Sequence, residues 1–246
     1  MSEFAAGPAG RIERVRALMT ERGYDAIVVR DEANLRWLTG VKGVFDYTFE
    51  FPHAAFITAD QCLFHTDSRY LNSFEENTSA GSPWVYDMDE GTIPGWVAGK
   101  IAANKCRVCA VEDDMQINFY QGIQRGLEDR SVACMLPLMH DDIRKMRAIK
   151  DAEEIELMRH AQSITDAAFQ HMLGYIKPGM TEKQVRNELE NFMFANGADS
   201  LAFGSIVASG PNTANPHAVP SDRVIEKGDF VLMDYGAGYC DYRSDM

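Results

Sequence analysis

The chain has 246 residues, 46% of them hydrophobic, and a formal net charge of −13 at pH 7. This length and apolar content suffice to bury one large core or two modest ones. The acidic balance argues against nucleic acid as a partner, because a phosphate backbone is bound through an excess of Lys and Arg. No stretch has the length of an apolar membrane span and no signal peptide is visible, so we expect a cytoplasmic protein that does not bind membranes.

Helical and strand patterns alternate through the first 138 residues. The predicted elements are helices at 11–22, 93–104 and 116–127 and strands at 26–29, 54–58, 62–66, 107–111 and 131–136. Such alternation predicts a three-layer or doubly wound α/β domain over residues 1–138. No Gly-rich phosphate loop opens any of these helices, so a nucleotide-binding role is unsupported.

Five cysteines are scattered through the sequence, and their odd number indicates reduced thiols more than a disulfide framework. Cys106 and Cys109 form a CxxC pair, but no second pair of soft ligands follows at the spacing of a structural zinc site. The pair lies in a predicted strand. We therefore expect two packed thiols.

Residues 139–246 follow a different pattern, with two helices before a set of strands. Asp151 with Glu154, and Thr181 with Gln184, predict capping boxes that begin the two helices. The apolar residues expected to face the core are Ile155, Met158, Ala161, Ile164, Ala168 and Met172 in the first helix and Val185, Leu189, Phe192 and Met193 in the second. Strands predicted at 203–208, 229–234 and 239–245 complete an α+β layout.

Two aspartates, Asp234 and Asp245, stand out in the final stretch DFVLMDYGAGYCDYRSDM. The stretch predicts a strand, a turn at Gly236 and Gly238, and a returning strand, so that both carboxylates reach one pocket. Paired carboxylate oxygens suit divalent ions such as Mn, Co or Mg. Two carboxylates are too few ligands for a catalytic dimetal centre, so this chemistry is incomplete within the chain.

The run from Gly210 to Met246, GPNTANPHAVPSDRVIEKGDFVLMDYGAGYCDYRSDM, resembles the first half of the catalytic motif of Xaa-Pro aminopeptidases and prolidases. The segments LRWLTG, RAIKDAEEIELMRHA and KPGMTE are similar to the same family, so the resemblance covers nearly the whole chain. It implies a creatinase-type α/β N-terminal domain followed, over 139–246, by an incomplete α+β pita-bread catalytic domain. Methionine aminopeptidases usually lack such an N-terminal domain, which favours the proline-specific branch.

The resemblance also implies roles for three residues. Asp234 would ligate one metal ion, Asp245 would bridge two, and His217 would line the substrate pocket without binding metal. Manganese is the metal typical of the family, and the same ligands would accept cobalt or zinc. The family's later histidine and two glutamate ligands have no counterpart before Met246, so we expect the chain as given to be catalytically incompetent. Relatives cleave proline-containing peptides and are often homodimers, which implies the same partners here.

Arg243 departs from the family pattern. Strand alternation predicts that Arg243 and Asp245 share a face. Pointing inward, its guanidinium would lower the pKa of the carboxylates and would also repel cations.

Three interpretations from different classes remain open at this point. The first is a fragment of a dimetal Xaa-Pro peptidase, and the second is a creatinase-like hydrolase that works without metal. The third is a non-catalytic pita-bread module that binds peptides or proteins. Metal titration separates the first from the second, and capture on proline-containing peptides tests the third.

Overall fold

A computed structural model describes residues 7–42, 52–88 and 91–246 of the chain. The chain divides into two compact units, residues 1–150 and 151–246. The sequence-based division after residue 138 falls before helix α6 (Asp142–Ala148), whereas the structure groups α6 with the first unit. The reason is packing, because Met139 and Ile143 are buried in a core of the first unit.

The first unit is built on a five-stranded mixed sheet in the order β4-β3-β2-β1-β5. Its strands are β1 (Ala26–Val29), β2 (Ala54–Thr58), β3 (Cys62–His65), β4 (Trp84–Asp87) and β5 (Cys109–Val111). β1 pairs with β2 in antiparallel and with β5 in parallel orientation. Residues 131–136, predicted as a strand, instead form a single isolated parallel bridge beside β5, between Val108 and Met135.

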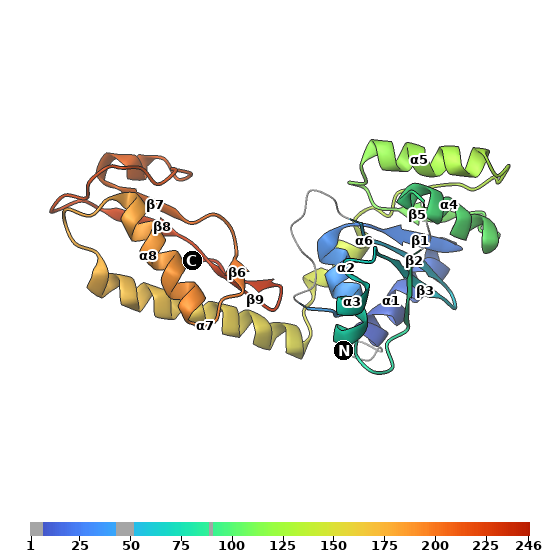
Figure 1. Ribbon diagram of the computed structural model, residues 1–246, viewed down its shortest axis with the longest axis horizontal. Coiled ribbons are helices and arrows are strands. Elements are labelled where there is room, and N and C mark those ends of the chain that lie inside the picture. The colour runs from blue at the N-terminus through green and yellow to red at the C-terminus, as the bar shows by residue number, and fades with distance from the viewer. Residues whose placement is uncertain (1–6, 43–51, 89–90) are drawn as a thin grey trace. The chain divides into compact units, whose positions relative to one another are not determined.

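Helices cover both faces of this sheet (Figure 1). The helices are α1 (Gly7–Arg22), α2 (Glu32–Thr39), α3 (Leu71–Asn77), α4 (Ile93–Ala103), α5 (Ile117–Glu128) and α6. Ile27 and Val29 of β1 face the core formed with α1, α2 and α3, whereas Ala26 and Val28 face the core formed with α4 and α5. Because both faces of the sheet are covered, β1 and β2 are buried at every position and show no polar alternation. The predicted three-layer α/β domain is confirmed.

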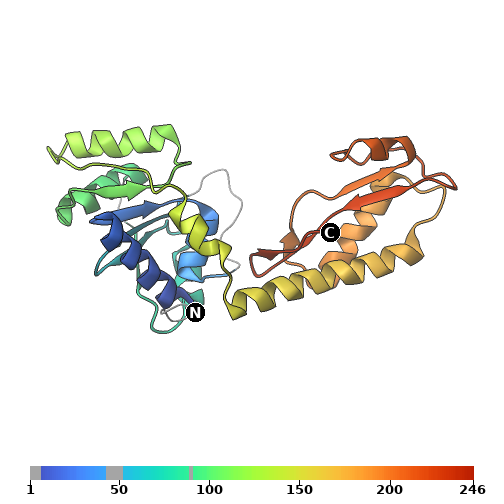
Figure 2. The same ribbon diagram turned by 180° about the vertical axis from the view of Figure 1, so that it is seen from behind.

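Two helices form one side of the second unit, α7 (Ala152–Tyr175) and α8 (Glu182–Ala195) (Figure 2). Both predicted capping boxes are present, with Asp151 and Thr181 as the N-caps. The expected apolar face of α7 is buried from Ala161 onward, but Ile155 and Met158 are each more than a third exposed. Only the later turns of α7 therefore belong to the core of the second unit.

The strands of the second unit are short and form two small sheets, β10-β9-β6 and β7-β8. They are β6 (Ser200–Leu201), β7 (Ile206–Ser209), β8 (Val231–Asp234), β9 (Ala237–Tyr239) and β10 (Tyr242–Arg243), and the 3-10 helix η1 (Gly210–Ala214) follows β7. Helices α7 and α8 pack on these strands around a core that includes Val207 and Tyr235.

The predicted turn at Gly236 and Gly238 is wrong, because the chain reverses later, at Cys240 and Asp241. Both of these residues have positive φ, 46° and 69°, as a two-residue type I′ hairpin turn requires. The two glycines instead allow neighbouring backbone segments to pack closely. A Cβ at Gly236 would lie 2.0 Å from the carbonyl oxygen of Ser244, and one at Gly238 would lie 2.2 Å from a serine hydroxyl of the neighbouring strand.

Candidate functional site

The two predicted metal carboxylates lie at the ends of strands in the two different small sheets of the second unit. Asp234 is the last residue of β8, opposite Ile206 of β7, and is half-buried. Asp245 follows β10 and is exposed. Their relative orientation follows from the hydrogen bonds that extend the β9–β10 hairpin.

These hydrogen bonds fix the register of the two segments. Tyr235 and Met246 exchange backbone hydrogen bonds in both directions, each with an N···O distance of 3.0 Å. The Ser244 N–H donates to the Ala237 carbonyl at 3.0 Å. The segments therefore run antiparallel, with Tyr235 opposite Met246 and Ala237 opposite Ser244.

This register places both carboxylates on one face. Asp245 lies opposite Gly236, and residues directly opposite one another in an antiparallel pair point to the same side. Asp234 is two positions from Gly236 and therefore shares that side. The aspartates are diagonal cross-strand neighbours, which typically lie about 7–8 Å apart. The expectation that both reach one site is thus consistent with the strand register, although the turn that brings them there differs from the predicted one.

The segment that carries Asp245 is anchored to helix α7 through the adjacent Ser244. The hydroxyls of Ser244 and Thr165 are hydrogen-bonded at 2.6 Å, and both residues are buried. The Ala237 N–H donates to both hydroxyl oxygens, at 2.9 Å to Ser244 and 3.1 Å to Thr165. These bonds hold the backbone on one side of Asp245 against α7.

Arg243 is exposed, and its Nη1 donates to the carbonyl of Ala202 at 2.9 Å. Register and alternation place Arg243 on the same face as Asp245, since each lies opposite a glycine of the same strand segment.

The donor set of the aspartates suits a hard divalent cation only in part. Neither carboxylate forms a hydrogen bond or ion pair with another residue in the described ranges, so their oxygens are available as ligands. No group of three or more His, Cys, Asp or Glu side chains among the described residues is arranged to hold a metal ion. Two oxygen ligands fit such a cation chemically but fall short of a complete coordination shell.

His217 lies in the segment that follows η1 and is exposed. Its backbone N–H donates to the side-chain oxygen of Asn215 at 3.1 Å. Among the described residues, no hydrogen bond or ion pair joins His217 to Asp234 or Asp245. The structure brings the two aspartates to one face and leaves the predicted pocket histidine on a separate loop.

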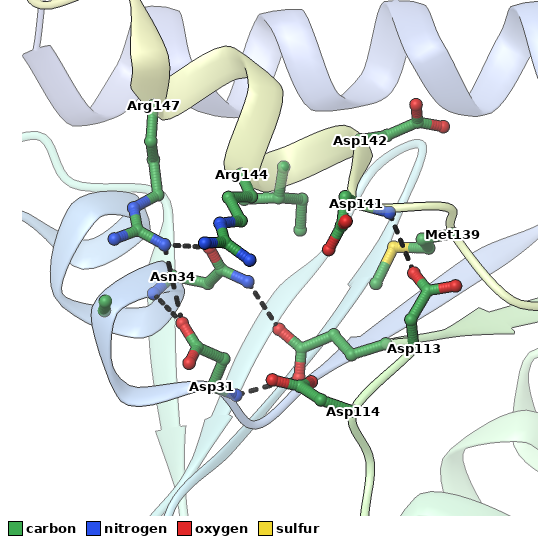
Figure 3. Close-up of a pocket in the computed structure, with 12 residues that line it drawn as sticks. Asp31, Asn34, Asp113, Asp114, Met139, Asp141, Asp142, Arg144 and Arg147 are labelled. Atoms are coloured by element: carbon green, nitrogen blue, oxygen red, sulfur yellow. Dashed lines mark hydrogen bonds and ion pairs between the residues drawn. The ribbon is translucent and has the colours of Figure 1, made fainter.

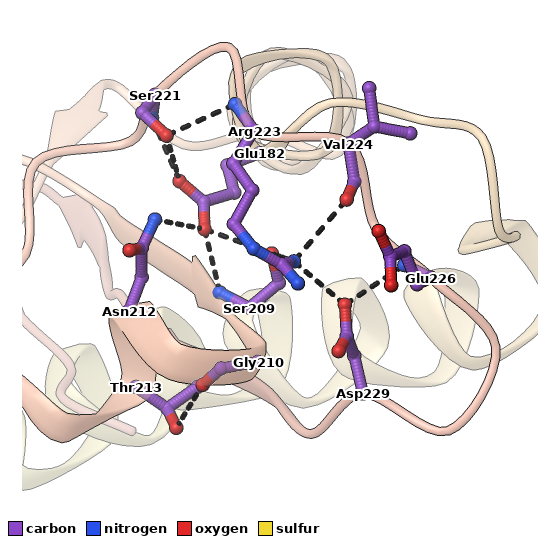
Figure 4. Close-up of polar contacts among 10 residues, drawn as sticks. All are labelled: Glu182, Ser209, Gly210, Asn212, Thr213, Ser221, Arg223, Val224, Glu226 and Asp229. Atoms are coloured by element: carbon purple, nitrogen blue, oxygen red, sulfur yellow. Dashed lines mark hydrogen bonds and ion pairs between the residues drawn. The ribbon is translucent and has the colours of Figure 1, made fainter.

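A residue that the sequence analysis did not single out lies at the base of this loop. Glu182, the first residue of α8, is fully buried and accepts hydrogen bonds from Ser209, Asn212 and Ser221 (Figure 4). In the sequence it looks like an ordinary acidic residue in a first helical turn, a position that favours negative charge. The polar residues before and after the His217 segment are the only sequence signal of its partners.

The first unit contains a polar pocket of about 260 Å³ where β1 and β5 end (Figure 3). Asp31 follows β1, Glu112 follows β5, and Arg147 of α6 lies on the opposite side. Glu112 is buried and accepts a hydrogen bond from Nδ2 of Asn34 at 2.7 Å. Arg147 donates to Oδ1 of Asn34 at 2.8 Å. This network ties α6 to the carboxyl ends of two parallel strands.

The packed thiols of the first unit are present as expected. Cys106 and Cys109 are buried in the core on the α4 and α5 side of the sheet, and burial raises the pKa of Cys106 to about 11. Both thiols therefore serve as small apolar core residues.

Comparison with known proteins accounts for both units. Residues 11–149 match the creatinase/prolidase N-terminal domain, and residues 156–246 match metallopeptidase family M24. The chain belongs to the family of the creatinase/prolidase N-terminal domain, whose model matches more than half of it, and its second unit matches metallopeptidase family M24. As in the expected architecture, a creatinase-type α/β domain precedes a partial M24 domain.

The relatives that match this chain are longer. An uncharacterized peptidase of Bacillus subtilis, YqhT, is 32% identical over 96% of this chain, which covers 63% of the relative. An Xaa-Pro dipeptidase of Pyrococcus horikoshii is 43% identical over 96% of this chain, which covers 62% of it. The solved structure of an Xaa-Pro dipeptidase from Bacillus anthracis has a TM-score of 0.84 at 33% identity and covers 97% of this chain, which in turn covers 63% of that structure. The chain thus spans less than two thirds of the length of these relatives.

No helix in the described part of the chain is both long and apolar enough to cross a membrane.

Proposed function

We propose that this chain provides the first metal carboxylates and part of the substrate pocket of a dimetal Xaa-Pro peptidase. The observation that carries the proposal is the pair Asp234 and Asp245, held on one face by the strand register, with no competing partner in the described ranges. Two relatives are named Xaa-Pro dipeptidases, which supports peptides with an X–Pro bond as the substrate class.

Asp234 and Asp245 are the residues that would hold divalent metal, and manganese is the ion we propose, with cobalt or zinc as alternatives. When bound, such ions polarise a peptide carbonyl and lower the pKa of a water molecule. The protein's part is to hold two carboxylate oxygens at fixed positions, which the anchoring of Ser244 to Thr165 supports. A complete centre needs further ligands, so we propose that residues 1–246 alone do not turn over substrate.

His217 is proposed to contact the substrate near the scissile bond. An exposed imidazole on a loop is free to donate a hydrogen bond to a carbonyl oxygen as negative charge develops there. We further propose a cytoplasmic homodimer, on the strength of the family resemblance.

Manganese titration tests the proposal directly. We expect weak Mn²⁺ binding by the 1–246 chain, measured from the electron paramagnetic resonance signal of free Mn²⁺. Asp234→Asn and Asp245→Asn should each weaken this binding at least tenfold, because each removes one of two ligands. Asp222→Asn is the matched control, since that exposed carboxylate pairs with Lys183 instead and should leave binding unchanged.

Equal binding in all three variants would contradict the metal site. If peptides containing X–Pro bonds bind while the Asp234 and Asp245 variants behave as the wild type, the chain is instead a metal-independent peptide-binding module or hydrolase.

A further inference from the structure

Glu182 is a buried carboxylate that the proposed chemistry does not use. It is the first residue of α8 and is 0% exposed. Burying a charge is costly unless hydrogen bonds replace its hydration. The contacts that make this burial tolerable therefore indicate what the residue does.

The two oxygens of Glu182 bind opposite ends of one loop (Figure 4). Oε1 accepts from the backbone N–H of Ser209 at 2.7 Å, from its hydroxyl at 2.9 Å, and from Nδ2 of Asn212 at 3.0 Å. Oε2 accepts from the backbone N–H of Ser221 at 3.0 Å and from its hydroxyl at 2.6 Å. One side chain thus closes the segment 210–220, with one oxygen at each end.

A short chain of hydrogen bonds leads from this carboxylate to His217. Asn212 donates its side-chain amide to Glu182, and its own carbonyl accepts from the Asn215 N–H at 3.1 Å. The side-chain oxygen of Asn215 then accepts from the His217 N–H at 3.1 Å. Three successive hydrogen bonds therefore join the buried carboxylate to the backbone of the exposed histidine.

The surroundings keep Glu182 ionised. Burial by itself would raise its pKa, but the hydrogen bonds from Ser221, Asn212 and Ser209 outweigh burial and lower the pKa to about 2. Nη1 of Arg223 donates to the Ser209 hydroxyl oxygen at 2.6 Å, which leaves the hydroxyl proton for Glu182. All five groups that face the carboxylate are donors. If glutamine replaced Glu182, its side-chain N–H groups would face these donors and could not form the same hydrogen bonds.

We propose that Glu182 is a positioning residue that sets the conformation of the His217 loop and thereby the position of the imidazole in the proposed substrate pocket. Glu182 itself touches neither substrate nor metal. The role assigned to the imidazole rests on the proposed function, whereas the closure of the loop rests on the contacts alone.

The test compares Glu182→Gln with Glu190→Gln in the 1–246 chain. Glu190 lies on the same helix, and its ion pair with Arg186 is long, at 4.0 Å. The Glu190 variant therefore controls for the loss of one negative charge and for the change in helix propensity. Amide hydrogen exchange should become at least tenfold faster in 210–220 of Glu182→Gln, with α7 and α8 unchanged. The Glu190 variant should match the wild type throughout.

A second measurement follows the imidazole itself. The chain has six histidines, and their carbon-bound ring protons can be observed by NMR. The resonance that is missing from the spectrum of His217→Gln belongs to His217. Mn²⁺ should broaden this resonance in the wild type, and the broadening should fall at least fivefold in Glu182→Gln at equal Mn²⁺ occupancy. Asn212→Ala, which cuts only the link toward His217, should reproduce this effect and keeps the test valid if Glu182→Gln fails to fold.

The outcomes separate the two proposals. Wild-type exchange in 210–220 of Glu182→Gln would overturn the loop role, as would faster exchange spread evenly over α7 and α8. Faster exchange with unchanged broadening of His217 would overturn the positioning of the imidazole. Absence of Mn²⁺ binding in the wild type would reject the proposed function, and the exchange comparison would still decide whether Glu182 closes the loop.

Discussion

In each unit of this protein a buried glutamate accepts hydrogen bonds from a neighbouring loop, Glu112 in the first and Glu182 in the second, and the two behave in opposite ways. Glu112, in the first unit, accepts from the backbone N–H groups of Arg30 at 2.5 Å and Asp31 at 2.8 Å and from Asn34. Its pKa is raised to about 7, first by burial, with a smaller contribution from the negative charge of Asp31. Glu182, in the second unit, has a pKa lowered to about 2.

The difference shows that burial alone does not set the charge of a carboxyl group. Glu182 has five donors, two of them hydroxyls, and lies at a helix N-terminus. Glu112 has three donors and an acidic neighbour in a pocket lined by further aspartates. The number of donors and the sign of nearby charge decide which form the fold favours.

Removal of Glu182 should give the largest effect. Glu182→Ala leaves several buried donors without an acceptor, and we expect the second unit to lose about 4 kcal/mol of stability. All three tryptophans, Trp37, Trp84 and Trp96, lie in the first unit, so their fluorescence follows only that unit during urea unfolding. A shift of the far-UV circular dichroism transition with an unchanged tryptophan transition is expected, and a shift of both would contradict the assignment.

A change of pH should affect the stability of the two units in opposite directions. Folded Glu182 stays ionised to about pH 2, whereas an unfolded glutamate binds a proton near pH 4.5, so its stabilisation is lost as pH falls from about 4.5 to 2. Folded Glu112 binds its proton near pH 7, so stability of the first unit is lost as pH rises from about 4.5 to 7. Each window corresponds to on the order of 3 kcal/mol.

Urea unfolding at pH 3, 5 and 8 measures both slopes, with tryptophan fluorescence for the first unit and amide exchange for the second. Glu112→Gln should remove the slope of the first unit between pH 5 and 8 and leave the second unit unaffected. A persistent slope in that variant would assign it to another group.

Substitution of an exposed carboxylate should cause the smallest loss of stability. Asp222 pairs with Lys183 at 2.8 Å, but its side chain is 81% exposed. Solvent screening and side-chain entropy reduce such pairs, so Asp222→Asn should change stability by less than about 0.5 kcal/mol. A larger loss in urea unfolding would mean that distance, rather than burial and donor number, governs the carboxylates of this protein.

Local signals in the sequence were sufficient for much of the fold. The capping boxes at Asp151 and Thr181 depend on residues three positions apart, and both are present. The apolar strands of the first unit were readable because burial of both faces leaves few polar residues in them. Asp234 and Asp245 were identified by spacing and family resemblance, and their shared face is consistent with the strand register.

Contacts between distant segments set the limit of this prediction. Gly236 and Gly238 suggested a turn because glycine favours turns, but they are required here where a neighbouring strand passes too close for a side chain. Residues 131–136 have strand character but form too few bridges to become a strand. Glu182 could not be distinguished from any first-turn acid, because its donors at 209, 212 and 221 reach it only after folding.

The hydrogen bond between Thr165 and Ser244 makes helix α7 a natural reporter of what happens at Asp245. A ligand bound by Asp245 would act on the adjacent Ser244, whose hydroxyl is hydrogen-bonded to Thr165 in the middle of a 24-residue helix. The amide resonance of Thr165 should therefore shift when the carboxylates are occupied. The resonance of this buried threonine would then report whether the carboxylates hold a ligand, even when the ligand itself gives no spectroscopic signal.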